Sequence, residues 1–210
     1  MTSKVNLVWV TPEAEEKIAY MARVSNPANQ DNPETAPKLL KYLINNNHWS
    51  PFEMVNVCME IETTRDIARQ ILRHRSFSFQ EFSQRYAISE DFEYSEARLQ
   101  DEKNRQNSIP VQDRELQAFW EEEQRIVLTA AQRAYGRALN AGIAKEQARK
   151  VLPEGLTMSR MYMNGTLRSW IHYCNIRCDK ATQKEHREVA DKCKKIISDL
   201  FPSLSTALEL

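Results

Sequence analysis

Residues 55–86 read VNVCMEIETTRDIARQILRHRSFSFQEFSQRY and contain the clearest structural pattern in the chain. From Val55 to Ile61 every second residue is apolar, which predicts a strand with one buried face. Residues 64–72 then space their apolar side chains as a helix does. Residues 73–86 follow with many polar groups that suit ligand binding. This stretch therefore predicts a strand that leads directly into a helix and then into a polar motif.

Three arginines lie on one side of this predicted helix. Arg65, Arg69 and Arg73 are four residues apart, so their guanidinium groups share one stripe. Like charges at this spacing destabilise a helix by roughly 0.2–0.5 kcal/mol per pair. We therefore expect an anion nearby. It is either a carboxylate such as Glu60 or Glu62, or a phosphate-bearing ligand, because arginine binds phosphate bidentately.

The polar motif after the helix favours a ligand. If residues 81–85 are extended, Glu81, Ser83 and Arg85 point to one face. That face offers an acceptor, a hydroxyl and a guanidinium, which together suit a nucleotide. The R-H-R cluster at residues 73–75 is, by itself, equally typical of a solvated or salt-bridged basic patch. Joined to the S-x-R sequence that follows, it is much more specific.

Composition bounds the class of protein. The chain has 210 residues, 41% of them hydrophobic and 28% charged, which predicts one globular domain over residues 1–210. Its formal net charge of zero argues against a general polyanion binder, so a nucleotide site needs a local concentration of charge. The sequence shows no signal peptide and no window apolar enough to span a membrane. We therefore expect a soluble, cytoplasmic protein.

The four cysteines, Cys58, Cys174, Cys178 and Cys193, contain no C-x-x-C pair. Cys174 and Cys178 are four residues apart on a predicted helix, and a metal site could start there. His172 is the one further soft ligand close by in the sequence. We therefore expect reduced thiols and no bound metal.

The remaining pattern predicts an α+β fold, with a central, mostly antiparallel sheet flanked by helices. Strands are expected over residues 5–10, 55–62, 81–85 and 156–164. Helices are expected over residues 11–24, 38–46, 64–72, 113–142, 144–151, 166–177 and 182–200. Residues 89–112 are polar and predict a surface excursion, of the kind that often forms a lid or an interface arm. With four glycines and no G-x-G-x-x-G, the chain offers neither a Rossmann nor a Walker loop.

The motif R-H-R, seven residues, then S-x-R stands here at residues 73–75 and 83–85. It resembles the motif of the flavin-dependent thymidylate synthases (ThyX). Four further segments resemble that family's motifs in the same order. They are A-R-V-S at 22–25, H-x-S-P-F-E at 48–53, R-x-x-L-P at 149–153, and L-R-S-W at 167–170 through N-I-R at 175–177. The resemblance covers nearly the whole chain.

The resemblance implies a fold and a reaction. The fold is a helix-flanked antiparallel sheet that assembles as a homotetramer, with flavin sites built between subunits. The reaction is the methylation of dUMP to dTMP. The carbon comes from 5,10-methylenetetrahydrofolate, and the hydride comes from FAD reduced by NADPH.

The resemblance also implies roles for individual residues. The residues implied to contact FAD are Ser25, Ser50, Glu53, Arg73, His74, Arg75, Glu81, Arg168 and His172. Those implied to hold dUMP are Gln70, Arg73, Glu81, Ser83, Gln84, Arg85, Arg149 and Arg177. His48 is implied to lie over the flavin and folate region.

Arg177 is the expected catalytic residue. A guanidinium at the uracil N3 and carbonyl edge stabilises negative charge as it develops on the ring, which is electrostatic catalysis. Hydride and carbon transfer belong to the cofactor chemistry, while the protein positions the rings. No cysteine lies in the matched motifs, so a cysteine nucleophile is not expected. Ser83 has no base beside it in the sequence, so we expect it to form hydrogen bonds.

Two other functions remain open at the level of sequence. One is a related nucleotide-using flavoenzyme that does not use folate. The other is a non-enzymatic RNA-binding module that uses the arginine stripe and stacks bases on Phe77, Phe79, Phe82 and Tyr86. The zero net charge weighs against RNA binding, and we expect no nucleic-acid partner.

Overall fold

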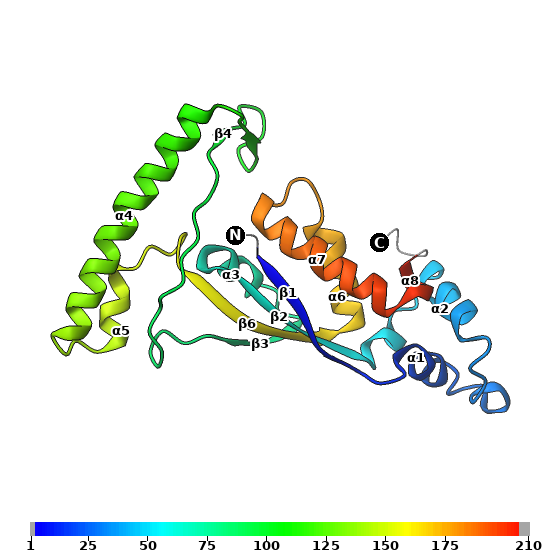
Figure 1. The fold of residues 1–210 in the computed structure, drawn as a ribbon. Coiled ribbons are helices and arrows are strands. Elements are labelled where there is room, and N and C mark those ends of the chain that lie inside the picture. The colour runs from blue at the N-terminus through cyan, green and yellow to red at the C-terminus, as the bar shows by residue number, and fades with distance from the viewer. Residues whose placement is uncertain (1–2, 206–210) are drawn as a thin grey trace.

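A four-stranded sheet forms the centre of the computed structural model, which describes residues 3–205. The strand order is β1 (Lys4–Val10), β2 (Asn56–Thr64), β6 (Met158–Thr166) and β3 (Phe77–Glu81). Every neighbouring pair is antiparallel. The sheet lies beneath a layer of helices (Figure 1), which confirms the predicted α+β fold with a mostly antiparallel sheet.

The pair β2–β6 supplies the inward face of the sheet. In its register Met59 lies opposite Met163 and Ile61 lies opposite Met161, and all four side chains are fully buried. Successive strand residues point to opposite faces, so these apolar positions form one row. The helices α6 (Leu167–Arg177) and α7 (Lys184–Leu200) cover this row (Figure 1). Burial of this face explains why alternation in the sequence identified β2 correctly.

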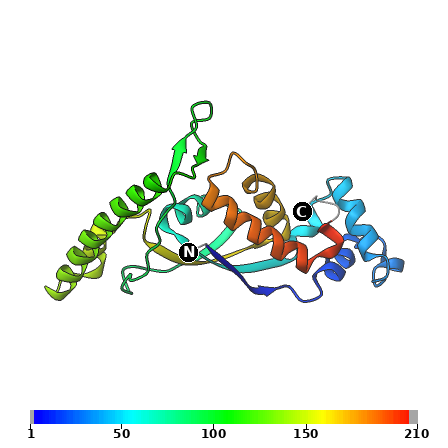
Figure 2. The same ribbon diagram turned by 45° about the horizontal axis from the view of Figure 1, so that its top comes forward.

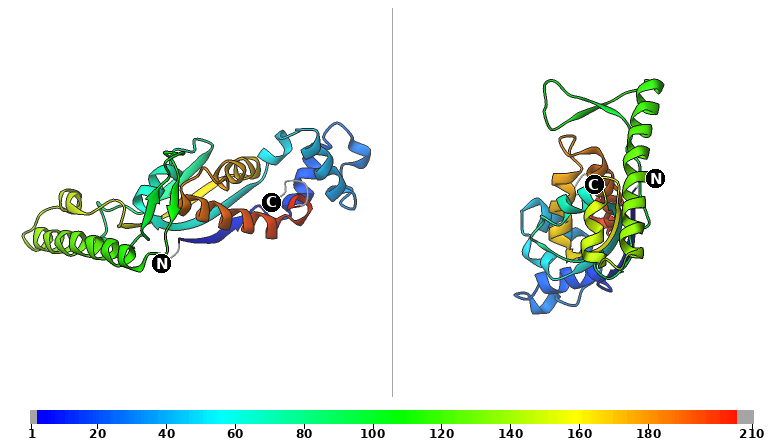
Figure 3. Two further views of the ribbon diagram at one scale, coloured as in Figure 1. Left: turned by 90° about the horizontal axis from the view of Figure 1, so that it is seen from above. Right: turned by 90° about the vertical axis from the view of Figure 1, so that its left-hand side faces the viewer.

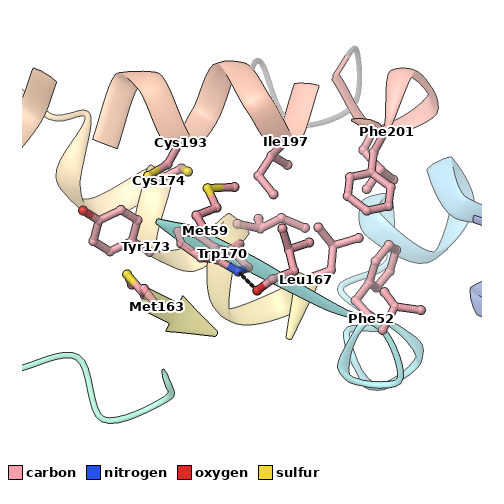
Figure 4. Close-up of a cluster of buried hydrophobic side chains, with 14 of the residues drawn as sticks. Phe52, Met59, Met163, Leu167, Trp170, Tyr173, Cys174, Cys193, Ile197 and Phe201 are labelled. Carbon is pink, nitrogen blue, oxygen red and sulfur yellow. Dashed lines mark hydrogen bonds between the residues drawn. The ribbon is translucent and has the colours of Figure 1, made fainter. Parts of the chain in front are cut away.

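Aromatic side chains of α6 fill the space between the helices and the sheet (Figure 4). Trp170 is fully buried, and its indole Nε1 donates a hydrogen bond to the carbonyl of Val57 at 2.9 Å. That bond satisfies the one polar atom of the indole and locks α6 onto β2. Tyr173 lies one turn further along α6 and is also fully buried. It places a phenol beside the end of the helix, where the polar site begins.

Strand β3 is held to β6 by an aromatic ring seated over a glycine. Phe77 pairs with Gly165 across the two strands. A Cβ atom at Gly165 would lie 2.3 Å from Cδ1 of Phe77, so the ring occupies the space that any other residue would fill. The ring also meets Trp170 edge-on, with 4.9 Å between the ring centroids. This packing fixes the position of the turn that precedes β3.

The first helix begins later than predicted. We expected Thr11 to cap a helix over residues 11–24, but α1 spans Ala14–Ala22. The Thr11 hydroxyl accepts a hydrogen bond from the Asn56 backbone N–H at 2.9 Å and donates to the Asn56 carbonyl at 3.3 Å. Thr11 therefore closes the end of the β1–β2 ladder instead of starting a helix.

Three short helices, at residues 27–29, 50–53 and 202–205, lie where we predicted none, and the other elements agree with the sequence to within a few residues. The 3-10 helix η1 (Pro27–Asn29) lies in the proline-rich loop, and α2 (Ala36–Asn45) follows. The turn at residues 48–53 contains the 3-10 helix η2 (Ser50–Glu53). The arginine-bearing helix is α3 (Arg65–Ile71), and α8 (Pro202–Ser205) follows α7. Of the helices within residues 3–205, none is long and apolar enough to cross a membrane.

An arm formed by residues 114–151 stands away from the sheet (Figures 1 and 2). Its helix α4 (Arg114–Asn140) begins as predicted, because the Asp113 carboxylate accepts hydrogen bonds from the first free backbone N–H groups. It ends before Gly142, whose φ of +79° is the left-handed conformation expected after a helix. The short α5 (Lys145–Ala148) and the 3-10 helix η3 (Arg149–Val151) return the chain to the sheet. Seen from above, the arm makes the molecule elongated (Figure 3).

The polar excursion at residues 89–112 carries more structure than we predicted. Its strands β4 (Arg98–Gln100) and β5 (Ser108–Pro110) pair as a small hairpin (Figure 2). The extended backbone before the hairpin is bound by glutamines of α4. Gln124 accepts from Ser95 N–H at 2.8 Å and donates to its carbonyl at 3.0 Å. Side-chain amides thus replace a neighbouring strand, so this segment needs no apolar periodicity.

Candidate active site

The turn that follows α3 meets the last turn of α6, although the two are far apart in the sequence. The chain turns sharply there, with His74 N–H bonded to the Ile71 carbonyl at 3.1 Å. The turn brings the His74 imidazole to the last turn of α6. There Arg177 Nε donates to His74 Nε2 at 2.9 Å across 103 residues of sequence. The structure therefore joins the R-H-R motif to the residue predicted to be catalytic.

The His74 imidazole is neutral in this setting. Its pKa falls from 6.5 to about 4 because the ring is buried and, after that, because it lies near Arg177, His172 and Arg73. Since Nε2 accepts the proton of Arg177 Nε, the hydrogen of the neutral ring is on Nδ1. His74 thus accepts from Arg177 without adding a charge, and the site keeps its guanidinium groups as its cations.

A cavity of about 570 Å³ is lined in part by Ser76 and Asn175, each two residues in sequence from a partner of this contact. Its lining residues are Trp49, Glu53, Ser76, Thr166, Arg168, Ser169, Ile171, His172 and Asn175. Three of them, Glu53, Arg168 and His172, are among the predicted flavin contacts. The Arg168 guanidinium donates to the Glu53 carboxylate, which ties α6 to η2 across the mouth. Its volume is within the usual range for ligand pockets, and its lining mixes aromatic, polar and charged groups.

The arginine stripe of α3 divides into two parts. Arg65 and Arg69 share the carboxylate of Glu81, at 3.5 and 3.6 Å, and Arg69 also pairs with Glu154 at 3.0 Å. Glu81 in turn accepts a hydrogen bond from Ser159 at 2.8 Å. Carboxylates of the same chain therefore neutralise these two arginines. The prediction of Glu60 and Glu62 as their partners is wrong, because Glu60 pairs with Arg160 and Glu62 with Lys4.

Three other arginines of the predicted site keep their charge available, whereas Arg85 and Arg168 are each paired with a carboxylate. Within residues 3–205, no ion pair or side-chain hydrogen bond forms at the guanidinium groups of Arg73, Arg75 or Arg149. Arg73 and Arg75 are exposed. Burial is the largest cause of the lowered pKa of Arg65, and the nearby charge of Arg149 also lowers that pKa. Charges without a carboxylate partner suit an anionic ligand.

The prediction that residues 81–85 are extended is wrong. Strand β3 ends at Glu81, and the chain then turns, with the N–H of Tyr86 bonded to the Ser83 carbonyl at 3.0 Å. The turn buries Gln84, whose amide donates to Ser89 at 2.9 Å. Ser83 and Arg85 stay on the outside, and Arg85 pairs with Glu146 of the arm at 3.4 Å. Alternation failed here because a local hydrogen bond, not sheet pairing, determines the orientation of Gln84.

Three predicted residues lie apart from the His74–Arg177 contact. Ser25 is exposed in the turn after α1, and Ser50 is exposed at the start of η2. His48 meets Tyr42 edge-on, with 6.3 Å between ring centroids. Among the described residues, no side-chain hydrogen bond or ion pair links any of the three to His74 or Arg177. Their roles stay predictions.

Sequence reasoning missed several residues around the site. Trp49, Ser76 and Asn175 line the cavity, and no spacing rule marks them because they come from three different elements. His186 of α7 is fully buried behind the site. It lies three and seven residues before Val189 and Cys193, on the same stripe of the helix. That spacing is a pattern from which a buried histidine could have been predicted.

The chain belongs to the Thy1 family, described as thymidylate synthase complementing protein, which it matches over residues 6–203. Its curated relatives include a flavin-dependent thymidylate synthase of Synechocystis sp. and a probable one of Paramecium bursaria Chlorella virus 1. The first is 53% identical over 93% of this chain and 89% of the relative. The second is 50% identical over 93% of this chain and 91% of the relative.

A solved structure shows the same fold. It is a UMP/dUMP methylase, PolB, from Streptomyces cacaoi bound with 5-Br dUMP. The two structures align with a TM-score of 0.87 and 25% sequence identity, over 99% of this chain and 94% of the other. The predicted family and fold are thus confirmed by independent comparisons of sequence and structure.

Proposed function

We propose that the chain is a flavin-dependent thymidylate synthase that methylates dUMP to dTMP. In this proposal 5,10-methylenetetrahydrofolate supplies the carbon and NADPH reduces the FAD. Relatives at 53% and 50% identity carry this activity in their names, and the structural neighbour is bound with a dUMP analogue. The structural observation that supports it most strongly is the 2.9 Å contact between Arg177 and His74. It brings the two matched motifs together beside arginines that lack carboxylate partners.

Arg177 is proposed to stabilise the negative charge that develops on the uracil ring. Its Nε–H is engaged by His74, which leaves the two terminal NH₂ groups for the ring's N3 and carbonyl edge. Because N3–H of neutral uracil is itself a donor, these groups first bind the adjacent carbonyl oxygen, and the interaction strengthens as negative charge develops on the ring. Because His74 is neutral, the positive charge near the ring stays on Arg177. His74 is therefore proposed to hold Arg177 in position.

The rest of the nucleotide is proposed to bind along the end of α3 and the turns on either side of β3. Arg73, Arg85 and Arg149 would bind the phosphate, because guanidinium groups bind phosphate bidentately. Gln84 would take part through its backbone, since its side chain is buried. The full proposed set is Gln70, Arg73, Glu81, Ser83, Gln84, Arg85, Arg149 and Arg177.

The residues present fit a flavin nucleotide. The cavity offers Trp49 and His172 as flat surfaces for a ring and Arg168 as a cation at its mouth. Arg73 and Arg75 lie at the adjoining turn, with no carboxylate partner in the described chain, and suit a pyrophosphate. When bound, the reduced flavin supplies the hydride. The proposed set is Ser25, Ser50, Glu53, Arg73, His74, Arg75, Glu81, Arg168 and His172, with His48 over the flavin and folate region.

We also propose that residues 1–210 act as one catalytic domain, in the cytoplasm, within a homotetramer. One hydrophobic core joins the sheet to α1, α2, α3, α6, α7 and α8, which supports a single domain. Phe119, Ile126 and Val127 of the arm are 58%, 50% and 51% exposed, and contact with other subunits would cover them. All four cysteines are free, as expected in a reducing compartment.

Two measurements test the proposal. Purified protein should be yellow and should release flavin on heating. It should also release tritium from dUMP labelled at C5, in a reaction that requires both NADPH and methylenetetrahydrofolate. Tritium release without folate would indicate the related flavoenzyme instead. A colourless protein that binds single-stranded RNA would indicate the non-enzymatic module and would reject the proposal.

A further inference from the structure

His186 lies behind the proposed site and is fully buried. Both of its ring nitrogens are engaged by elements other than its own helix. Nδ1 lies 3.2 Å from the amide oxygen of Gln70 on α3, across 116 residues of sequence. Nε2 lies 3.2 Å from the hydroxyl of Tyr173 on α6. His186 therefore links the helix that carries the proposed nucleotide ligands to the helix that carries Arg177.

The same contacts continue outward from Gln70 to a carboxylate. The Gln70 amide donates to the amide oxygen of Gln183 at 2.7 Å, and the Gln183 amide donates to Glu185 at 3.1 Å. Arg98 of the β4–β5 hairpin donates to the other oxygen of Glu185. Burial raises the pKa of Glu185, but the hydrogen bond and charge of Arg98, a backbone hydrogen bond and the Gln183 hydrogen bond together outweigh burial and lower it. Glu185 is therefore ionised and acts only as an acceptor.

Because the Glu185 carboxylate can only accept, it determines which partner donates and which accepts in each hydrogen bond from Gln183 to His186 and Tyr173. Gln183 must turn its nitrogen toward Glu185, so its oxygen faces Gln70. Gln70 must then turn its nitrogen toward Gln183, so its oxygen faces His186. His186 consequently carries its hydrogen on Nδ1 and accepts at Nε2 from the Tyr173 hydroxyl. The pKa of His186 falls to about 3, because of burial and then of Arg177 and His74, so the ring is neutral as this order requires.

We propose that His186 is a positioning residue that holds the Gln70 amide, in the orientation set by Glu185, toward a bound pyrimidine nucleotide. This inference rests on the proposed function, in which Gln70 binds dUMP. With one N–H and one lone pair already engaged, Gln70 offers the ligand one donor and one acceptor in a fixed order. Without the bond to His186, the Gln70 amide is held by Gln183 alone and is free to tilt away from this position.

Two substitutions separate the contact of His186 with Gln70 from its contact with Tyr173. The amide of asparagine occupies the place of Nδ1, so His186→Asn keeps a donor toward Gln70 and loses the contact with Tyr173. The amide of glutamine reaches the place of Nε2, so His186→Gln keeps an acceptor for Tyr173 and loses the contact with Gln70. Both variants place an amide in the same cavity, which makes each the control for the other.

The test is the dUMP dissociation constant of the flavin-loaded protein, measured by calorimetric titration. For His186→Gln we expect a rise of roughly five- to tenfold, the equivalent of one hydrogen bond, and for His186→Asn a change of less than about twofold. In turnover the effect of His186→Gln should fall on KM for dUMP, with kcat at saturating dUMP retained. Flavin content and thermal unfolding confirm that both variants fold.

The inference is overturned if His186→Gln binds dUMP as the unsubstituted protein does. It is also overturned if both variants weaken dUMP binding equally, since that would indicate a packing defect. Where the variants do not fold, Glu185→Gln replaces them. It removes the acceptor-only end, so dUMP should bind more weakly, and an unchanged dissociation constant overturns the inference. If the unsubstituted protein binds flavin but no dUMP, the proposed function itself has failed.

Discussion

Arg177 illustrates how the residue scale sets the chemistry of the site. Its Nε–H is bonded to a histidine that cannot share its charge, because burial and neighbouring cations keep that ring neutral. The guanidinium therefore carries one fixed positive charge with its two terminal NH₂ groups still available. Such a group costs little reorganisation when negative charge appears nearby.

We predict that Arg177→Ala lowers kcat by roughly a hundredfold or more, the usual effect of removing a donor that stabilises a developing anion. Flavin should remain bound, because Arg177 does not line the cavity beside His172. Steady-state kinetics and the visible flavin spectrum provide the two readouts. Arg177→Lys is the control, because it keeps the charge and loses the two parallel donors. Its kcat should lie between that of the unsubstituted protein and that of Arg177→Ala. Near-full activity of the alanine variant would exclude the proposed role.

A second prediction concerns the contact between Gly165 and Phe77. Gly165→Ala places a methyl group 2.3 Å from the Phe77 ring and should destabilise the protein by roughly 1–3 kcal/mol. Gly136→Ala in α4 meets no atom within 4 Å and should instead stabilise it by roughly 0.5–1 kcal/mol. Urea unfolding measures both changes. Equal effects of the two substitutions would show that the ring is free to move aside.

At the scale of elements, the glutamines of α4 replace a strand. Gln124 binds both backbone groups of Ser95, and Gln117 binds both backbone groups of Ala97, at 2.8 and 3.0 Å in each case. Each amide thus completes the hydrogen bonding of an extended residue that has no partner in a sheet. The polar excursion is held in place by these bonds and not by apolar burial.

We predict that Gln124→Ala loosens this segment without unfolding the molecule. Gln124 is 4% exposed, so its loss leaves the Ser95 N–H and carbonyl without partners. Hydrogen exchange should become faster at the Ser95 amide, while amides of β2 keep their protection. Gln132→Ala, at an exposed position of the same helix, is the control and should change neither. Unchanged exchange at Ser95 would contradict the role given to Gln124.

Elements with one buried face were predictable from the sequence, and those organised by side-chain hydrogen bonds were not. Alternation predicted β2 because Met59 and Ile61 form part of a buried row. The next strand was predicted over residues 81–85, but β3 spans Phe77–Glu81. The polar spacing after Glu81 resembles a strand, whereas the chain forms a turn there that buries Gln84. Motif resemblance supplied Arg177 and His74, but their contact depends on α6 meeting the turn that follows α3. No local pattern specifies such a contact.

At the scale of the whole molecule, two neutral histidines make stability depend on pH. The pKa values of His74 and His186 fall from 6.5 to about 4 and about 3 in the folded protein, because both rings are buried near Arg177. Above pH 6.5 neither the folded nor the unfolded chain protonates them, so their contribution is complete. Below it the unfolded chain takes up protons first, and stability falls toward pH 4 and then pH 3.

We therefore predict a urea midpoint that falls as the pH is lowered from about 7 to about 5. His186→Gln removes one of the two titrating rings, so its midpoint should fall less over the same interval. Measuring both proteins in the same buffers cancels the contribution of the carboxylates, which they share. Parallel curves for the two proteins would show that His186 takes up protons as readily in the folded state as in the unfolded one.

The strand order β1-β2-β6-β3 also has a consequence for synthesis. Strand β6 lies between β2 and β3, and its residues follow those of β2 by about a hundred positions, with Asn56 opposite Thr166. A nascent chain therefore exposes β2 and β3 from the synthesis of Glu81 until that of Met158, with nothing to join them. Unpaired edges of this kind favour association with other chains. A pause in translation before residue 158 has been synthesised should thus make folding of the chain depend on chaperones.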